Sequence, residues 1–115
     1  IGGAYNCDND AFFLVNAIKS LRNYHLDKSF ISSRALDRQN GLSDNNEIEA
    51  EMHRTVLEIA GRNILLADHT KLNKASFIRT CDFSHINTVI TDEKLSLDWR
   101  DFFTNKRIEW LECAE

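Results

Sequence analysis

The chain has 115 residues with a formal net charge of −4, and 43% of them are hydrophobic. This length suits one domain that buries roughly two thirds of its unfolded surface. The acidic balance argues against a chain whose main task is holding nucleic acid, since phosphate neutralisation requires clustered Lys and Arg. The longest apolar runs are far shorter than the ~20 residues that span a bilayer, so we expect a soluble protein. Cys7, Cys81 and Cys113 lack C-x-x-C spacing, which favours free thiols in a reducing cytoplasm.

The first third of the chain predicts a helix, a strand and a loop. The opening Ile1-Gly2-Gly3 is typical of a loop after a strand, so we expect the sequence to begin inside a larger protein. A helix ending near Tyr24 is predicted by residues at helical spacing after a capping side chain. The caps are Asp8, Asn9 or Asp10, and the apolar stripe is Leu14, Ala17, Ile18 and Leu21. Residues 29–32 predict a strand, and residues 37–46 a polar loop in which Gly41 takes backbone angles that other residues avoid.

The middle of the chain contains the strongest helix signal. Asp44 followed three residues later by Glu47 predicts a capping box, and Gly61 predicts the C-terminal stop. Between them, one apolar stripe is formed by Ile48, Met52, Val56 and Ile59. Strands are then expected at 64–67, 76–80 and 88–91, a helix at 95–105 and a strand at 107–111. Strands that alternate with helices predict an α/β fold with a mostly parallel sheet flanked by helices.

Charged residues follow the predicted strand at 64–67. This run is continuously aliphatic, which is typical of a central parallel strand, and Asp68 and Lys71 come directly after it. Because the carboxyl ends of the strands in open α/β sheets bind ligands, we expect Lys71 to meet a phosphate or a hydroxyl. Asp68 could orient Lys71 or accept a sugar hydroxyl, although an Asp at this place also serves as a turn or cap residue.

Three further candidates lie on the predicted middle helix. Glu49 and His53 are one turn apart and could share a ligand or metal ion, but no third ligand is evident and a solvated face is the favoured reading. Arg54 could bind a phosphate bidentately, or could pair with Glu51 and Glu58 on the surface. No metal or cofactor is predicted, because the spacing of His and Cys fits no known ligand motif.

Five short motifs resemble, in order and spacing, the C-terminal effector domain of DeoR-type bacterial transcriptional repressors. They are Asp27-Lys28-Ser29-Phe30, Asn40-Gly41-Leu42-Ser43, Glu49-Ala50-Glu51, Leu65-Leu66-Ala67-Asp68-His69-Thr70-Lys71 and Val89-Ile90-Thr91-Asp92. The chain departs from the family at Ala35, where Gly is usual, at His53, where Lys is common, and at Leu72, where an aromatic residue often follows the Lys. These departures concern the identity of the ligand more than the fold.

The resemblance implies a fold similar to ribose-phosphate isomerase, glucosamine-phosphate deaminase and the CoA-transferases. It implies one effector domain over residues 1–115 that senses a phosphorylated sugar and forms a homo-oligomer, with the repressor of the lactose phosphotransferase system as one subtype. The ligand-binding residues would be Lys71, Asp68, Glu49, Arg54 and Gly41. In this family the winged helix-turn-helix, which contacts the operator DNA, and a Gly/Ser/Thr-rich phosphate loop precede an Ile-Gly-Gly such as this one. We therefore expect the 115 residues alone to bind sugar phosphate weakly or not at all.

Two other functions remain open from the sequence. A sugar-phosphate isomerase-like enzyme would need a carboxylate base and an electrophile, and Asp68 with Lys71 supplies one such pair without a second acid. A structural module would only dimerise, through a surface formed by aromatic residues, namely Trp99, Phe102, Phe103 or Trp110. We predict a sensor and not an enzyme. The sugar phosphate, the operator and the oligomeric state do not follow from the sequence.

Overall fold

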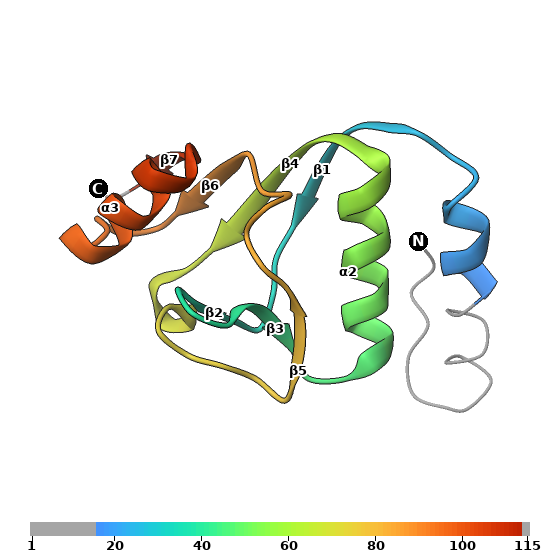
Figure 1. Cartoon of the computed structure of the whole chain (residues 1–115), viewed down its shortest axis with the longest axis horizontal. Coiled ribbons are helices and arrows are strands. Elements are labelled where there is room, and N and C mark those ends of the chain that lie inside the picture. The colour runs from blue at the N-terminus through green and yellow to red at the C-terminus, as the bar shows by residue number, and fades with distance from the viewer. Residues whose placement is uncertain (1–15, 114–115) are drawn as a thin grey trace.

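The computed structural model of the chain describes residues 16–113 (Figure 1). Residues 16–21 are helical and a turn follows, which agrees with the predicted end of the first helix. Ile18 of this segment is buried, as its place in the apolar stripe predicts. The predicted caps at Asp8, Asn9 or Asp10 lie outside the described residues, and so does the opening Ile1-Gly2-Gly3. No helix within the described part of the chain is long and apolar enough to cross a bilayer.

A four-stranded parallel sheet forms the centre of the domain. Its strands are β1 (Leu26–Ile31), β4 (Ala60–Ala67), β6 (Thr88–Thr91) and β7 (Glu109–Glu112), in the spatial order β1-β4-β6-β7. All three strand pairs are parallel, so the predicted α/β class with a mostly parallel sheet is confirmed. β7 begins two residues later than predicted, because Arg107 takes a left-handed conformation (φ 60°) that ends the preceding helix.

A second, antiparallel sheet was not predicted. It consists of β2 (Ala35–Asp37), β3 (Gly41–Asp44) and β5 (Ile78–Cys81), in the order β2-β3-β5. The prediction of a polar loop at residues 37–46 was therefore wrong, because most of that segment is a hairpin. Gly41 does take a conformation that other residues avoid (φ 76°), and the backbone of Cys81 and Asp82 lies directly against its Cα.

Helix α2 (Glu47–Ile59) packs against β1, β3, β4 and β5. Its N-cap is Asn46, whose side chain accepts a hydrogen bond from the backbone N–H of Glu49, so the predicted capping box at Asp44 was wrong. Asp44 is instead the last residue of β3 and is almost fully buried. The predicted stop at Gly61 was also wrong: the helix ends at Ile59, its C-cap Ala60 is already extended, and Ala60 and Gly61 both belong to β4.

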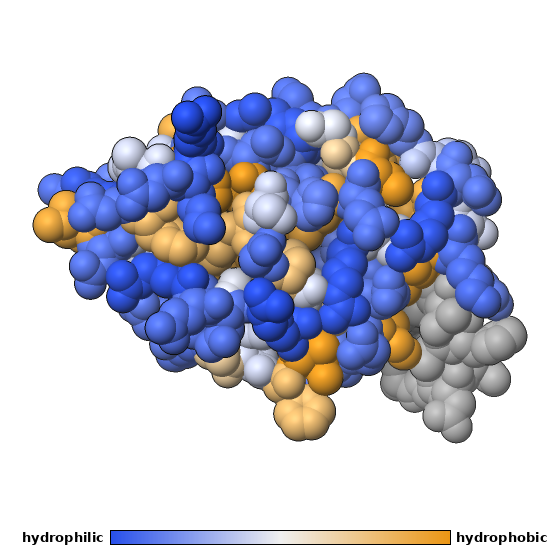
Figure 2. Space-filling model, viewed as in Figure 1, coloured by the Kyte–Doolittle hydropathy of each residue, from blue (hydrophilic) through white to orange (hydrophobic). Residues whose placement is uncertain are grey.

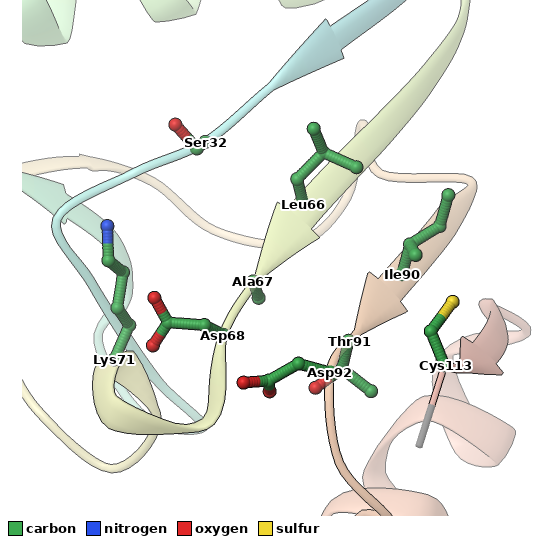
Figure 3. A pocket seen from close by; sticks show the side chains of 9 residues that line it. All are labelled: Ser32, Leu66, Ala67, Asp68, Lys71, Ile90, Thr91, Asp92 and Cys113. Carbon is green, nitrogen blue, oxygen red and sulfur yellow. The ribbon is translucent and has the colours of Figure 1, made fainter. Parts of the chain in front are cut away.

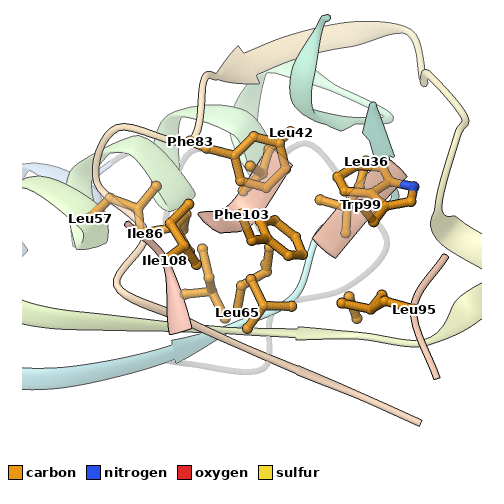
Figure 4. Close-up of a cluster of buried hydrophobic side chains, with 13 residues drawn as sticks. Leu36, Leu42, Leu57, Leu65, Phe83, Ile86, Leu95, Trp99, Phe103 and Ile108 are labelled. Carbon is orange, nitrogen blue, oxygen red and sulfur yellow. The ribbon is translucent and has the colours of Figure 1, made fainter. Parts of the chain in front are cut away.

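Helix α3 (Leu97–Lys106) supplies the aromatic part of the core (Figure 4). Trp99 and Phe103 are 1% and 0% exposed, and both lie edge-on or tilted against neighbouring aromatic rings. The hypothesis that these two residues form a dimerisation surface was therefore wrong, because the core encloses them. Phe102 and Trp110 are partly buried against the same cluster.

The two faces of the parallel sheet differ in exposure. Residues in register on one face, Ile31, Leu65 and Val89, are buried in the core. On the other face Phe30 and Leu66 are 63% and 42% exposed, and Leu111 of the edge strand is 56% exposed. The view in Figure 2 is mainly hydrophilic, with hydrophobic groups visible between the polar side chains.

Candidate functional site

A group of polar side chains lies at the carboxyl ends of the parallel strands. A hollow of about 360 Å³ opens there. It is lined by Ser32, Leu66, Ala67, Asp68, Lys71, Ile90, Thr91, Asp92 and Cys113 (Figure 3). The parallel register of β4 with β6 carries the residues that follow these two strands to the same edge of the sheet. Asp68 and Lys71 are thus brought together with Asp92, and Leu66 and Ile90 supply an apolar wall.

Asp68 fixes the short turn that carries Lys71. It caps the 3₁₀ helix η1 (His69–Lys71), where its Oδ1 accepts a hydrogen bond from the backbone N–H of Thr70 (2.8 Å) and another from the Thr70 hydroxyl. These bonds are the main reason that the pKa of Asp68 lies below its ordinary value, and the positive charge of Lys71 contributes. The structure therefore gives Asp68 the cap role that the sequence left open, and this role uses only one of its two carboxylate oxygens.

Lys71 lies between two hollows. Figure 3 shows its side chain rising beside Asp68 toward the segment of Ser32. Within residues 16–113 its ammonium group forms no ion pair with a carboxylate, whereas Arg34, which lines the adjoining hollow, lies 3.6 Å from Glu49. Lys71 thus offers a positive charge that the described part of the chain does not neutralise by direct contact.

His69 and Asp92 join η1 to the end of β6. Asp92 accepts two bonds from His69, one from the backbone N–H (2.8 Å) and one from the ring Nδ1 (3.0 Å), and Glu93 lies 3.6 Å from the same ring nitrogen. The hydrogen bond with Asp92 is the main reason that the pKa of His69 is raised, and the same bond lowers the pKa of Asp92. These two hydrogen bonds fix η1 to Asp92, which lines the large hollow.

A second, smaller hollow adjoins the first and has a volume of about 240 Å³. All of its lining residues are polar: Ser32, Ser33, Arg34, Asp44, Glu49 and Lys71. Ser32 and Lys71 line both hollows, so they form a shared wall. Of the predicted candidates, Lys71 and Glu49 therefore meet in the small hollow, while Asp68 lies in the large one.

A buried hydrogen-bond network surrounds Asp44, which lines the small hollow. The Asp44 carboxylate is 2.9 Å from Nδ1 of His53, accepts a hydrogen bond from the Thr80 hydroxyl, and lies 3.4 Å from the backbone N–H of Arg34. Burial acts to raise the pKa of Asp44, but the hydrogen bonds from His53, Thr80 and Arg34 outweigh it, and the pKa is lowered. His53 therefore pairs with Asp44, and the predicted alternative in which it shares a ligand with Glu49 has no counterpart in these contacts.

Arg54 and Gly41 lie apart from both hollows. The Arg54 guanidinium donates to the backbone carbonyls of Thr80 (2.7 Å) and Arg79 (2.9 Å) and to the Glu47 carboxylate (2.8 Å), and the bond to Glu47 raises its pKa. Gly41 turns the β2–β3 hairpin. Neither residue is brought together with Lys71, so their assignment to the ligand site stays a prediction without support from the geometry.

Several residues of the two hollows were not predicted to belong to the ligand site, namely Ser32, Ser33, Arg34, Asp44 and Asp92. Asp92 carried a usable signal, because it follows a buried strand just as Asp68 does. Ser32 carried a similar signal, because it directly follows β1, whereas Ser33 and Arg34 carried none. No cluster of three or more His, Cys, Asp or Glu that could hold a metal ion occurs in the described ranges.

Comparison with known proteins now identifies the family. The model of the DeoR C-terminal sensor domain matches residues 1–93. The chain belongs to this family. The DeoR-type domain is 35% identical over 97 residues to the "Putative aga operon transcriptional repressor" of Escherichia coli O157:H7, which covers 84% of this chain and 36% of that protein.

Two further relatives of this DeoR-type domain are also transcriptional regulators by name. The L-fucose operon activator of Haemophilus influenzae is 32% identical over 94 residues, with 82% of this chain and 38% of that protein covered. The HTH-type transcriptional regulator GlpR of Haloferax volcanii is 36% identical over 77 residues, with 67% and 30% covered. The matched part of the chain thus spans 30% to 38% of the length of these relatives. The family model identifies the chain as a DeoR C-terminal sensor domain, and its relatives include a protein named as a repressor and one named as an activator.

Proposed function

We propose that this domain binds a phosphorylated sugar at the carboxyl ends of β1, β4 and β6, and that binding modulates DNA binding by a separate N-terminal domain of the same protein. The observation that supports this most directly is the position of Lys71. Its ammonium lines both hollows and is not paired with a carboxylate among the described residues. A compact ammonium on a flexible stem is well suited to bind phosphate as a point charge.

The rest of the large hollow suits the sugar itself. Asp68 and Asp92 can accept hydrogen bonds from hydroxyl groups, and their lowered pKa values keep both carboxylates ionised at neutral pH. Leu66 and Ile90 provide apolar contact for the C–H groups of a sugar ring. A pocket with apolar walls and a few convergent polar groups is the usual form of a small-molecule site.

An isomerase-like activity has less support from the same geometry. Proton abstraction from a carbon acid needs a carboxylate base within hydrogen-bond reach of the substrate and an electrophile for the developing negative charge. Asp68 is engaged by Thr70, and Asp92 is held by both the backbone and the ring of His69. These hydrogen bonds lower the pKa of both carboxylates, which makes them weaker general bases although they can still accept hydrogen bonds from hydroxyl groups. We therefore propose a sensor that is not an enzyme.

The remaining parts of the proposal concern the whole protein. The regulator would act in the cytoplasm as a homo-oligomer and would contact operator DNA only through its N-terminal domain. The names of the relatives point to sugar operons, and the lactose phosphotransferase subtype stays a prediction. Effector binding would shift the protein between two states that differ in affinity for the operator.

The test is a thermal-shift screen of the full-length protein against glucose 6-phosphate, fructose 6-phosphate, galactose 6-phosphate and ribose 5-phosphate. A ligand present at 100 times its Kd adds about 2.7 kcal/mol to the free energy of unfolding, which a melting curve resolves readily. Lys71→Ala should abolish the stabilisation and the effector response of operator binding, with basal operator affinity intact. The matched control is Lys74→Ala, since Lys74 is exposed and lines neither hollow. If Lys71→Ala responds to the effector as the parent does, the proposal fails.

A further inference from the structure

The small hollow contains three polar groups that its own surroundings do not use. Glu49 Oε1 is buried and has no hydrogen-bond partner among the described residues, while Oε2 of the same carboxylate lies 3.6 Å from the Arg34 guanidinium. Lys71 and Ser32, which line the hollow with it, have no hydrogen bond from their side chains to residues 16–113. An acceptor, a cation and a hydroxyl are thus available together.

Two other polar residues of this hollow, Asp44 and Ser33, already have hydrogen-bond partners, and Arg34 lies 3.6 Å from Glu49 Oε2. Asp44 is bonded by His53, Thr80 and the backbone N–H of Arg34, and Ser33 donates to the carbonyl of Ala35 (3.2 Å). The buried Glu49 oxygen is therefore an exception in an otherwise satisfied cluster. Burying a carboxylate oxygen without a donor costs free energy, and a ligand hydroxyl that reaches it would recover that cost.

We propose that the two hollows form one ligand site in which Lys71 binds the phosphate at the shared wall and Glu49 Oε1 accepts a hydrogen bond from a sugar hydroxyl in the small hollow. This inference rests on the proposed function and assigns the orientation of the bound ligand. Asp44 and Glu49 place two carboxylates in the small hollow, and the guanidinium of Arg34 offsets part of their negative charge. The unpartnered Glu49 Oε1 is the feature that favours a hydroxyl donor there.

Glu49 is then a specificity-determining residue. A site built to hydrogen-bond a hydroxyl rejects compounds that lack it, because the buried polar group is left without a partner. Inorganic phosphate carries the anionic group but no sugar hydroxyl. It should bind at Lys71 without using Glu49. The roles of the two residues can therefore be separated by comparing the affinity for inorganic phosphate with the affinity for a sugar phosphate.

The experiment measures binding of inorganic phosphate and of the four sugar phosphates named above to the full-length protein by calorimetry. Glu49→Ala should weaken binding of the preferred sugar phosphate at least about tenfold, the usual worth of one hydrogen bond to a charged group. The same variant should leave inorganic phosphate within about twofold, whereas Lys71→Ala should weaken both ligands. Glu49→Gln preserves the shape of the side chain and should give an intermediate loss. Glu51→Ala is the control, because Glu51 lies on the same helix in surface ion pairs with Arg22 and Arg54.

The outcomes separate the two proposals. If a sugar phosphate binds the parent protein and Glu49→Ala leaves its affinity unchanged, the assignment of Glu49 is overturned while the sensor function stands. Equal weakening of inorganic phosphate and sugar phosphate by Glu49→Ala also overturns it, since Glu49 would then act on the phosphate end. If no sugar phosphate binds the parent protein, the proposed function itself is refuted, and this inference with it.

Discussion

Asp44→Ala should be among the most destabilising single substitutions in the domain. Asp44 is 1% exposed, and its carboxylate accepts hydrogen bonds from the side chains of His53 and Thr80. Each bond to a charged group is worth roughly 1.5–3 kcal/mol, so losing both costs about 3–6 kcal/mol before relaxation. The His53 side chain is 14% exposed and can regain some hydration, so we expect a loss of about 3 kcal/mol. In a domain of this size that lowers the Tm by roughly 12 °C.

The assay is urea unfolding followed by tryptophan fluorescence, since Trp99 lies in the core. Asp98→Ala is the matched control, because Asp98 is 73% exposed on its side chain and its only ion pair among the described residues is 3.8 Å long, to Arg38. The control should change the free energy of unfolding by less than about 0.5 kcal/mol. A loss below about 1 kcal/mol for Asp44→Ala would refute the reasoning, because the buried network would then contribute no more than a surface pair.

The same carboxylate gives a prediction for pH. Because the pKa of Asp44 is lower in the folded state than in the unfolded chain, its contribution to stability is complete above the unfolded pKa and is lost as the pH falls through the folded pKa. The free energy of unfolding should therefore decrease as the pH falls below about 4. In Asp44→Asn this part of the decrease should be absent, and an unchanged pH profile in that variant would contradict the prediction.

Three further expectations concern Gly41 of the hairpin, His69 of η1 and Phe103 of the core. Gly41→Ala should lower the free energy of unfolding by about 2 kcal/mol or more, because φ is positive at Gly41 and the Cys81 carbonyl occupies the place of a Cβ. In the same urea assay, the control Gly61→Ala should cost far less, because φ at Gly61 is not positive and the nearest atom to an added Cβ is 3.3 Å away. The pKa of His69, followed by NMR, should lie above its ordinary value and should fall in Asp92→Asn, and an unchanged pKa in that variant would refute the assigned cause. The contribution of His69 to stability is present below the pKa of the unfolded chain and is lost as the pH rises through the pKa of the folded state. Phe103→Ala should cost about 3–5 kcal/mol and leave the oligomeric state unchanged by light scattering.

The parallel sheet could be predicted from the sequence because its signals are local. The aliphatic run of β4 is continuous, and a charged turn follows it at once, so the strand, its direction and the place of Lys71 all follow from adjacent residues. The same holds for the run at β6 and Asp92.

The hairpin and the small hollow could not be predicted, because they depend on contacts between distant residues. β3 contains Ser43 and Asp44, which look like loop residues, and their burial is possible only because other segments satisfy them. The Ser43 hydroxyl accepts from the backbone N–H of Ser76, and Asp44 is bonded from α2 and β5. Asp44 also has the spacing of a capping box with Glu47, so local pattern favoured the wrong role.

The exposed sheet face has a consequence for how folding of this domain is assayed. Phe30, Leu66 and Leu111 remain accessible although the opposite face is tightly packed. Dyes such as 8-anilinonaphthalene-1-sulfonate fluoresce on accessible hydrophobic surface, and that fluorescence is commonly taken as a sign of a molten globule. Here the natively packed domain should itself enhance the dye signal, so loss of native packing has to be judged from near-ultraviolet circular dichroism instead.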